Sequence, residues 1–375
     1  MGTLKIIHSA DWQLGKPFGR FPLEVRNALA EARLDAIDEL GKAATNAGAA
    51  HVVVAGDVFD NVEPGDRIVM QALSRMERVP VTWWLMPGNH DHARAGGLWS
   101  RVRGRAPSSV RIVDTAQPVE MEEGGWLLPA PLEHRKTTND PTAAMVDMTT
   151  PPGALRIGLA HGSITEFGAS GESSNLIPPD RAKSAGLDYL ALGDWHGYLT
   201  VGDRTAYSGT PETDRFGREE PGACIAVNLR SEEAPQLRRV DTGRFRWISR
   251  RWNVANEAEL ETEIAALRSE SRLSDVLLSL NLMGVASLSD RVSMTKILKD
   301  RLAHELRHLD LDTEELIARP TSDDIAKIEV QGALAGATAA LQAKADASGP
   351  EALIAASALE RLYVEALRFD AEVSR

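Results

Sequence analysis

The chain has 375 residues, which exceeds the size at which one hydrophobic core usually keeps growing, so we expect a main domain with smaller additions. Hydrophobic residues make up 43% of the sequence and charged residues 26%, a composition that excludes a wholly disordered chain. The single cysteine, Cys224, excludes an intramolecular disulfide framework and a zinc site built from cysteines alone.

The charge balance and the N-terminus limit the class of function further. The 42 basic and 54 acidic residues give a net charge of -12, which is not typical of a protein that coats nucleic acid. Aromatic residues make up only 5%, which argues against a surface that stacks bases. The first eight residues lead directly into a strand pattern with neither a signal peptide nor an apolar span, so we expect a cytoplasmic protein that does not associate with membranes.

Five short apolar runs are predicted to be buried β-strands, and polar residues follow each of them. The runs are residues 4–8, 51–55, 81–85, 155–160 and 187–192, and a helix is predicted over residues 23–46. The polar residues that follow them are Asp11-Trp12-Gln13, Gly56-Asp57, Asn89-His90-Asp91, His161-Gly162 and Asp194-Trp195-His196. Because strand ends meet at one edge of the sheet in a layered α/β fold, and ligand sites form there, we expect these residues to lie together.

The pattern changes in the second half of the chain. Residues 206–252 are predicted to form short β segments, including 223–229 and 246–252. A helix over residues 257–268, a strand over 276–282, a helix over 290–309 and a short strand over 316–318 follow, and beyond residue 320 the sequence is Ala-rich and helical. We therefore expect a main domain over residues 1–252, a capping domain over 253–320 and a helical tail over 321–375.

The polar strand ends supply carboxylates, amides and imidazoles. Mixed oxygen and nitrogen ligands suit two divalent cations about 3.5–4 Å apart, the arrangement used for in-line displacement at phosphate esters. A carboxylate can bridge the two ions, and a water held between them becomes hydroxide near neutral pH. The sequence has no Ser-His-Asp elbow, P-loop or GxGxxG motif, so acyl transfer and nucleotide-cofactor chemistry are not indicated.

The ordered motifs DxQ, GDxxD, GNHD, HG and DxH closely resemble those of the calcineurin-like metallophosphoesterases. The run from Tyr207 to Glu212, followed by Phe216-Gly217 and Glu219, is similar to the YxGSPE…F stretch of SbcD-type DNA repair exonucleases. The motifs cover about residues 3–230, whereas residues 250–375 resemble that family only in layout. The resemblance implies a four-layer α/β sandwich, with two mixed sheets flanked by helices, a small α/β cap domain and a helical C-terminal tail.

The resemblance also implies roles for the motif residues. One metal ion would be held by Asp11, Gln13, Asp57 and His196, and a second by Asp57, Asn89, His161 and Asp194, with Asp57 as the bridge. His90 is similar to the family histidine that contacts the scissile phosphate and helps the leaving oxygen depart, and Asp91 is expected to orient its imidazole. Gln13 and Asp194 stand where the family usually has histidine. Because both offer oxygen in place of nitrogen, we expect Mn²⁺, or else Mg²⁺, at the site.

The function that we expect is metal-dependent hydrolysis of DNA phosphodiesters in DNA repair, as an exonuclease or endonuclease. The resemblance further implies a homodimeric nuclease core and an SbcC-like, SMC-type coiled-coil ATPase partner that docks on the tail. Two alternatives stay open. A small-substrate phosphodiesterase would use the same metal site, and the residues Gln13 and Asp194 suggest a weakly catalytic metal-binding scaffold for the ATPase.

Overall fold

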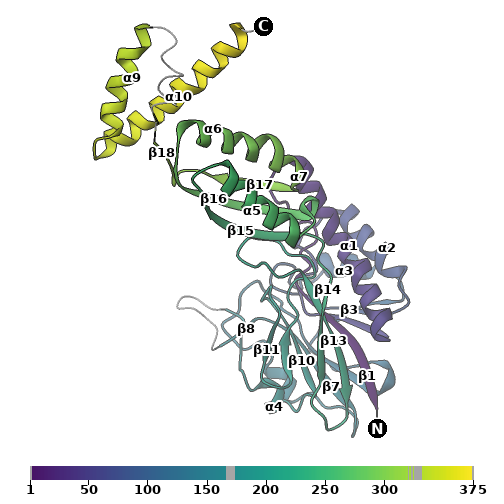
Figure 1. Ribbon diagram of the computed structural model, residues 1–375. Helices are drawn as coiled ribbons and strands as arrows, with labels where there is room; N and C mark the ends of the chain where they lie inside the picture. Colours follow the sequence, from purple (N-terminus) through teal and green to yellow (C-terminus); the bar gives the residue numbers. More distant parts are fainter. Residues whose placement is uncertain (1, 166–173, 320, 322–323, 325–331, 374–375) are drawn as a thin grey trace. The chain divides into compact units, whose positions relative to one another are not determined.

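The computed structural model describes residues 2–165, 174–319, 321, 324 and 332–373. The chain forms two compact units (Figure 1). The first comprises Met1–Asp214 and Glu220–Arg246, and the second comprises Arg215–Glu219 and Trp247–Arg375. Residues 322–323, 325–331 and 374–375 of the predicted tail lie outside the described residues. The division into three domains at residues 252 and 320 stays a prediction.

The first unit contains two six-stranded mixed sheets. One has the order β14 (Gln236–Asp241), β13 (Ala223–Arg230), β1 (Thr3–Ser9), β2 (His51–Val54), β3 (Thr82–Leu85) and β4 (Val110–Ile112). The other has the order β11 (Leu199–Val201), β12 (Thr205–Tyr207), β10 (Tyr189–Gly193), β7 (Leu155–His161), β6 (Gly125–Ala130) and β5 (Val119–Glu120). β1 to β4 run parallel to one another, as do β6, β7, β10 and β12. β8 (Ser163–Ile164) and β9 (Leu176–Ile177) form a separate small sheet.

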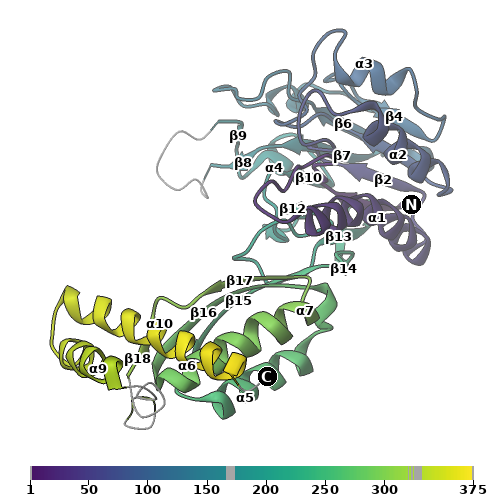
Figure 2. The same ribbon diagram turned by 90° about the horizontal axis from the view of Figure 1, so that it is seen from above.

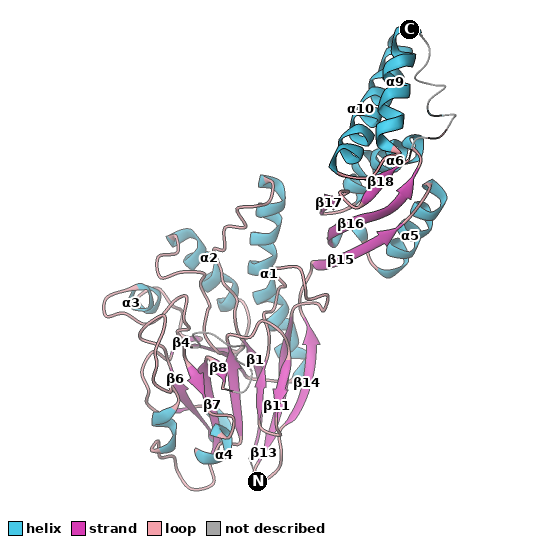
Figure 3. Ribbon diagram, turned by 90° about the vertical axis from the view of Figure 1, so that its left-hand side faces the viewer, coloured by secondary structure: helices cyan, strands magenta, loops and turns pink. Residues whose placement is uncertain are grey.

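Three apolar clusters hold the layers of this unit together. One packs the first sheet against α1 (Leu23–Ala47), α2 (Asp66–Glu77) and α3 (Leu98–Arg103). The second cluster lies between the two sheets, and the third packs the outer face of the second sheet against the short helices η2 (Ala143–Val146) and α4 (Arg181–Ser184). Side chains alternate along β1 as strand geometry requires, with Ile6 between the sheets and Ile7 toward the helices. These layers (Figure 3) confirm the predicted sandwich of two mixed sheets flanked by helices.

The second unit contains a four-stranded sheet of β15 (Arg246–Asn253), β16 (Val276–Ala286) and β17 (His308–Asp312), with β18 (Leu316–Ala318) also paired to β16. Its core joins this sheet to α5 (Glu257–Glu270) and α6 (Leu288–Ile297). The helix predicted over residues 290–309 is wrong at its end. α6 continues through the π-helical turn η4 (Leu298–Leu302) to α7 (Ala303–Glu305), and residues 308–309 begin β17. There, Leu309 and Leu311 alternate with aspartates, the period of a strand, and pair in parallel with β16.

Two helices, α9 (Gly332–Ala345) and α10 (Pro350–Val373), complete the second unit and lie side by side (Figure 2). Leu359 and Tyr363 of α10 are buried against Leu288, at the start of α6. Arg291 and Glu360 add an ion pair of 2.7 Å between the same two helices. Among the described helices, none is both long and apolar enough to cross a membrane.

Candidate metal centre

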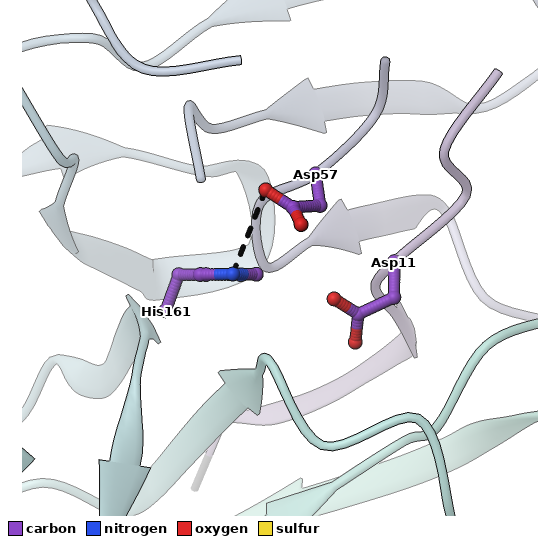
Figure 4. A group of neighbouring side chains, drawn as sticks. All are labelled: Asp11, Asp57 and His161. Carbon is purple, nitrogen blue, oxygen red and sulfur yellow. Dashed lines mark ion pairs between the residues drawn. The ribbon is translucent and has the colours of Figure 1, made fainter. Parts of the chain in front are cut away.

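The residues predicted to form the site follow strands of both sheets. They are Asp11 and Gln13 after β1, Asp57 after β2, Asn89, His90 and Asp91 after β3, His161 at the end of β7, and Asp194 and His196 after β10. Because the strands within each sheet that carry them are parallel, their carboxyl ends meet at one edge. Three of the side chains, Asp11, Asp57 and His161, are buried with one ligand atom each within 4.8 Å of the others (Figure 4).

The backbone turns sharply at these strand ends. Asp11, Asp57 and Asp194 have φ angles of 55°, 54° and 99°, in a region that costs a non-glycine residue about 1–3 kcal/mol unless the surroundings hold it. The Asp11 amide donates to the carbonyl of Gly56 at 3.1 Å, which ties the ends of β1 and β2 together. A Cβ atom on Gly88 would lie 2.3 Å from Asp57 Oδ1. Any larger residue at position 88 would therefore clash with the Asp57 carboxylate in its present position.

His161 presents a ring nitrogen to two carboxylates. Its Nδ1 donates to the carbonyl of Ala55 at 2.8 Å, so the neutral ring carries a lone pair on Nε2. This Nε2 lies 3.6 Å from Asp57 Oδ1 and 3.8 Å from Asp194 Oδ1. It is buried and has no hydrogen-bond partner, and the same holds for Asn89 Oδ1. Buried polar atoms rarely stay unpaired, so two neutral ligand atoms beside two carboxylates fit a divalent cation.

The electrostatics of the cluster favour a cation as well. Burial raises the pKa of Asp11 to about 6, although His196 and His161 oppose the shift. Burial alone would lower the pKa of His161, but the carboxylates of Asp57, Asp11 and Asp194 outweigh it and raise that pKa to about 9. Without a metal ion, a protonated His161 would offset the charge of these carboxylates; a divalent ion bound there would supply that positive charge instead and leave the ring neutral.

Asp194 has hydrogen bonds with three residues besides its contact with His161. Its backbone amide donates to both carboxylate oxygens of Asp11, at 3.1 and 3.2 Å. Ser163, which the motifs did not indicate, donates its hydroxyl to Asp194 Oδ2 at 2.7 Å. Asn89 Nδ2 donates to the other oxygen of Asp194 at 3.1 Å, which leaves the amide oxygen of Asn89 as the available ligand atom.

His90 and Asp91 are held in different ways. The His90 amide donates to Asp57 Oδ1 at 2.9 Å, and its ring Nδ1 donates to the carbonyl of Asp60 at 2.9 Å. The Asp91 carboxylate is buried and accepts from the amides of Phe59, at 2.9 Å, and Gly88, at 2.7 Å. Asp60 therefore fixes the His90 ring directly, whereas any effect of Asp91 on that ring would act through the backbone of the loop.

Gln13 and His196 meet an ion network that the motifs did not indicate. Lys16 Nζ donates to Gln13 Oε1 at 2.8 Å and to Asp214 Oδ2 at 2.5 Å. Asp214 Oδ2 is also 3.3 Å from His196 Nδ1, while Gln13 Nε2 is 3.3 Å from His196 Nε2. The Gln13 oxygen that was predicted to bind a metal ion therefore contacts an ammonium group, and the amide nitrogen faces His196.

Asp214 is the centre of this network. Its carboxylate is buried and lies 3.4 Å from the guanidinium of Arg33, which is buried too. Burial by itself raises the pKa of Asp214, but the hydrogen bond with His196 and the charges of Arg33 and Lys16 outweigh it and hold that pKa well below its usual range. Asp214 follows the run from Tyr207 to Glu212 by two residues, so its proximity to that run was the available signal in the sequence.

We expect Lys16→Met to strengthen cation binding beside Asp11 and His196. The substitution removes an ammonium that competes for Gln13 Oε1 and repels a cation, and methionine keeps the length of the side chain. The second equivalent of Mn²⁺ should bind about tenfold more tightly, a difference of about 1.4 kcal/mol, as measured by calorimetric titration. Lys42→Met, at an exposed lysine paired with Glu39, is the matched control. Unchanged affinity for both equivalents of Mn²⁺ would contradict the expectation.

The part of the chain that carries the site is similar to known proteins. The model of the calcineurin-like phosphoesterase family matches residues 4–198, more than half of the 375-residue chain and all of the predicted site residues. A subunit of the nuclease SbcCD from Bacillus subtilis (strain 168) is 34% identical over 95 residues, so the match spans 24% of this chain and only 22% of that relative. One solved structure has a TM-score of 0.41 at 13% identity, covering 64% of this chain and 99% of its own. A structure from Thermus thermophilus has a TM-score of 0.38 at 12% identity, covering 56% and 90%.

Proposed function

The chain belongs to the calcineurin-like phosphoesterase family, and on that basis we propose that it is an SbcD-like nuclease that hydrolyses DNA phosphodiesters. The family supports metal-dependent hydrolysis of phosphoesters. The observation that carries the proposal to this site is the pair of buried, unpartnered ligand atoms, His161 Nε2 and Asn89 Oδ1, close to the carboxylates of the cluster. The proposal that the substrate is DNA draws its support from the similarity to the SbcCD nuclease.

Two groups of side chains would hold the metal ions. Asp57, Asn89, His161 and Asp194 form one group, and Asp11, Gln13 and His196 form the other, with Asp57 shared between them. Divalent cations bound there would offset charge on the phosphate and lower the pKa of an attacking water. The donor set is rich in oxygen, which favours Mn²⁺ or Mg²⁺ over ions that prefer sulfur or nitrogen.

His90 is the residue of this chain that would act on the leaving group. Because its Nδ1 donates to the Asp60 carbonyl, Nε2 remains to contact a bound phosphate. When the ring is protonated, Nε2 can give its proton to the oxygen that departs. The amide of His90 is tied to Asp57, so the position of the ring is linked to that of the metal ligands.

We also propose the partners that the resemblance implies. The relative from Bacillus subtilis is by its name one subunit of a nuclease. An SMC-type coiled-coil ATPase would dock on the tail, where Leu353 and Ile354 of α10 are 64% and 69% exposed. The nuclease core would be a homodimer. The Lys16–Gln13 contact is an observation that favours the alternative of a weakly catalytic scaffold for this ATPase, which the residues Gln13 and Asp194 suggested.

The direct test is cleavage of end-labelled duplex and single-stranded DNA with Mn²⁺ or Mg²⁺. We expect the intact chain to cut DNA and His90→Ala to lower the rate about 10²- to 10⁴-fold, the usual contribution of a general acid. His304→Ala, at an exposed histidine in the second unit, serves as the control. An intact chain that binds Mn²⁺ but cuts no DNA, alone or with the ATPase, would favour the scaffold.

A further inference from the structure

A cationic pocket of about 560 Å³ adjoins His90. Its lining includes Asp60 after β2, His92 and Arg94 after β3, and His134 and Arg135 after β6. His90 belongs both to this lining and to the metal centre, because its amide donates to Asp57 Oδ1. The pocket is therefore directly adjacent to the candidate metal centre, with His90 between them.

The pocket is positively charged. Two guanidinium groups and three imidazoles line it against one carboxylate among the described residues, that of Asp60. Arg94 Nε donates to His92 Nε2 at 3.1 Å, so these two side chains are held together.

The positive charge continues beyond this pocket. A second cavity of about 300 Å³ shares His92 and Arg94 with the first, and its lining also includes Arg101, in the last turn of α3, and the acidic Glu63. Arg101 is held in place by a hydrogen bond of 2.8 Å to the carbonyl of Pro64. His92, Arg94 and Arg101 thus supply cationic side chains beyond His90, although Asp66 lies 3.6 Å from Arg101. Several cations near one another suit a ligand that carries negative charge at more than one point along its length.

We propose that this pocket binds the phosphate next to the scissile one on the leaving-group side of a nucleic acid strand. The inference rests on the proposed function, in which His90 faces the leaving oxygen. Arginines recognise phosphate through charge-assisted hydrogen bonds, and contacts to the backbone set the register of a strand without reading its sequence. The pocket would therefore favour oligonucleotides over diesters that have a single phosphate.

The test compares two substrates and two variants. Thymidine oligonucleotides have many phosphates, whereas bis(p-nitrophenyl) phosphate has one. For the double variant Arg94→Gln/Arg135→Gln, we expect the ratio of kcat/KM on the oligonucleotide to kcat/KM on the small diester to fall about tenfold or more, since hydrogen bonds to charged groups are lost. Arg230→Gln, at a half-exposed arginine paired with Glu233 outside the pocket, should leave the ratio unchanged.

Binding gives a second readout that does not depend on turnover. The affinity for a fluorescein-labelled oligonucleotide, measured by anisotropy with Ca²⁺ present, should fall in the double variant, and its dependence on salt should weaken by roughly one unit of slope. If the double variant binds and cuts the oligonucleotide like the intact chain, the proposal that this pocket binds a phosphate is wrong, whereas the proposal that the chain is a nuclease still stands. If the intact chain cuts only the small diester, the proposed nuclease activity itself is wrong.

Discussion

Asp57→Asn is expected to abolish metal-dependent hydrolysis while the chain stays folded. Asp57 is buried between the two proposed ligand groups, 3.6 Å from His161 Nε2, and its Oδ1 accepts the amide of His90. Asparagine keeps the shape of the side chain but removes the charge and one ligand oxygen. Because a metal ion supplies several kcal/mol of transition-state stabilisation, kcat/KM should fall about 10³-fold or more.

Thermal unfolding separates this loss from misfolding. In the intact chain, Mn²⁺ at 100 times its Kd should stabilise the fold by about 2.7 kcal/mol, and Asp57→Asn should lose that shift. Without metal, the variant should be at least as stable as the intact chain, because it buries one fewer negative charge beside Asp11 and Asp91. Asp203→Asn, at an exposed turn between β11 and β12, is the control. If the variant kept both the stabilisation by Mn²⁺ and the hydrolysis, Asp57 would not be part of the metal centre.

The convergence of Asp11, Asp57 and His161 could be predicted because each follows, or ends, a short apolar strand. Asp11, Asp57 and His161 lie far apart in the sequence, but parallel strands bring their ends to one edge whatever the length of chain between them. The α/β sandwich was predicted from the resemblance to the family, and the two sheets and their flanking helices confirm it. The end of the helix predicted over residues 290–309 failed because leucines at 306, 309 and 311 suit a helix as well as a strand, and pairing with β16 decides between them.

The network around Gln13 could not be predicted in the same way. Arg33 lies inside α1, and in the sequence it looks like any surface arginine of a long helix until the fold shows that it is buried. Lys16 and Asp214 are 198 residues apart, and neither follows an apolar strand directly. The substitution of Gln for the usual His at position 13 was visible, but its consequence depends on the ammonium of Lys16, which only the three-dimensional structure brings to it.

Asp214→Ala is expected to destabilise the first unit by about 3–5 kcal/mol, because it leaves a buried cation without its partner. The side chains of Arg33 and Asp214 are only 2% and 3% exposed, so the guanidinium would stay buried away from bulk solvent after its carboxylate is removed. Urea unfolding in EDTA measures the loss. Adding Arg33→Met to Asp214→Ala should restore part of the stability, since it removes the unpaired charge. If Asp214→Ala alone lowers the free energy of unfolding by less than about 1 kcal/mol, this account is contradicted.

The same variant should also weaken the metal centre, through His196. Asp214 holds His196 Nδ1 at 3.3 Å, which leaves Nε2, 3.9 Å from Asp11 Oδ1, as the nitrogen that faces the site. Removing a carboxylate that orients a metal-binding histidine costs about 10- to 100-fold in metal affinity. In a Mn²⁺ titration, one of the two equivalents, that bound beside His196, should show this loss of affinity. Arg33→Met in the double variant restores charge balance but not this orientation, and its metal affinity should therefore stay low even where its stability recovers. Recovery of both together would mean that Asp214 acts on the fold alone.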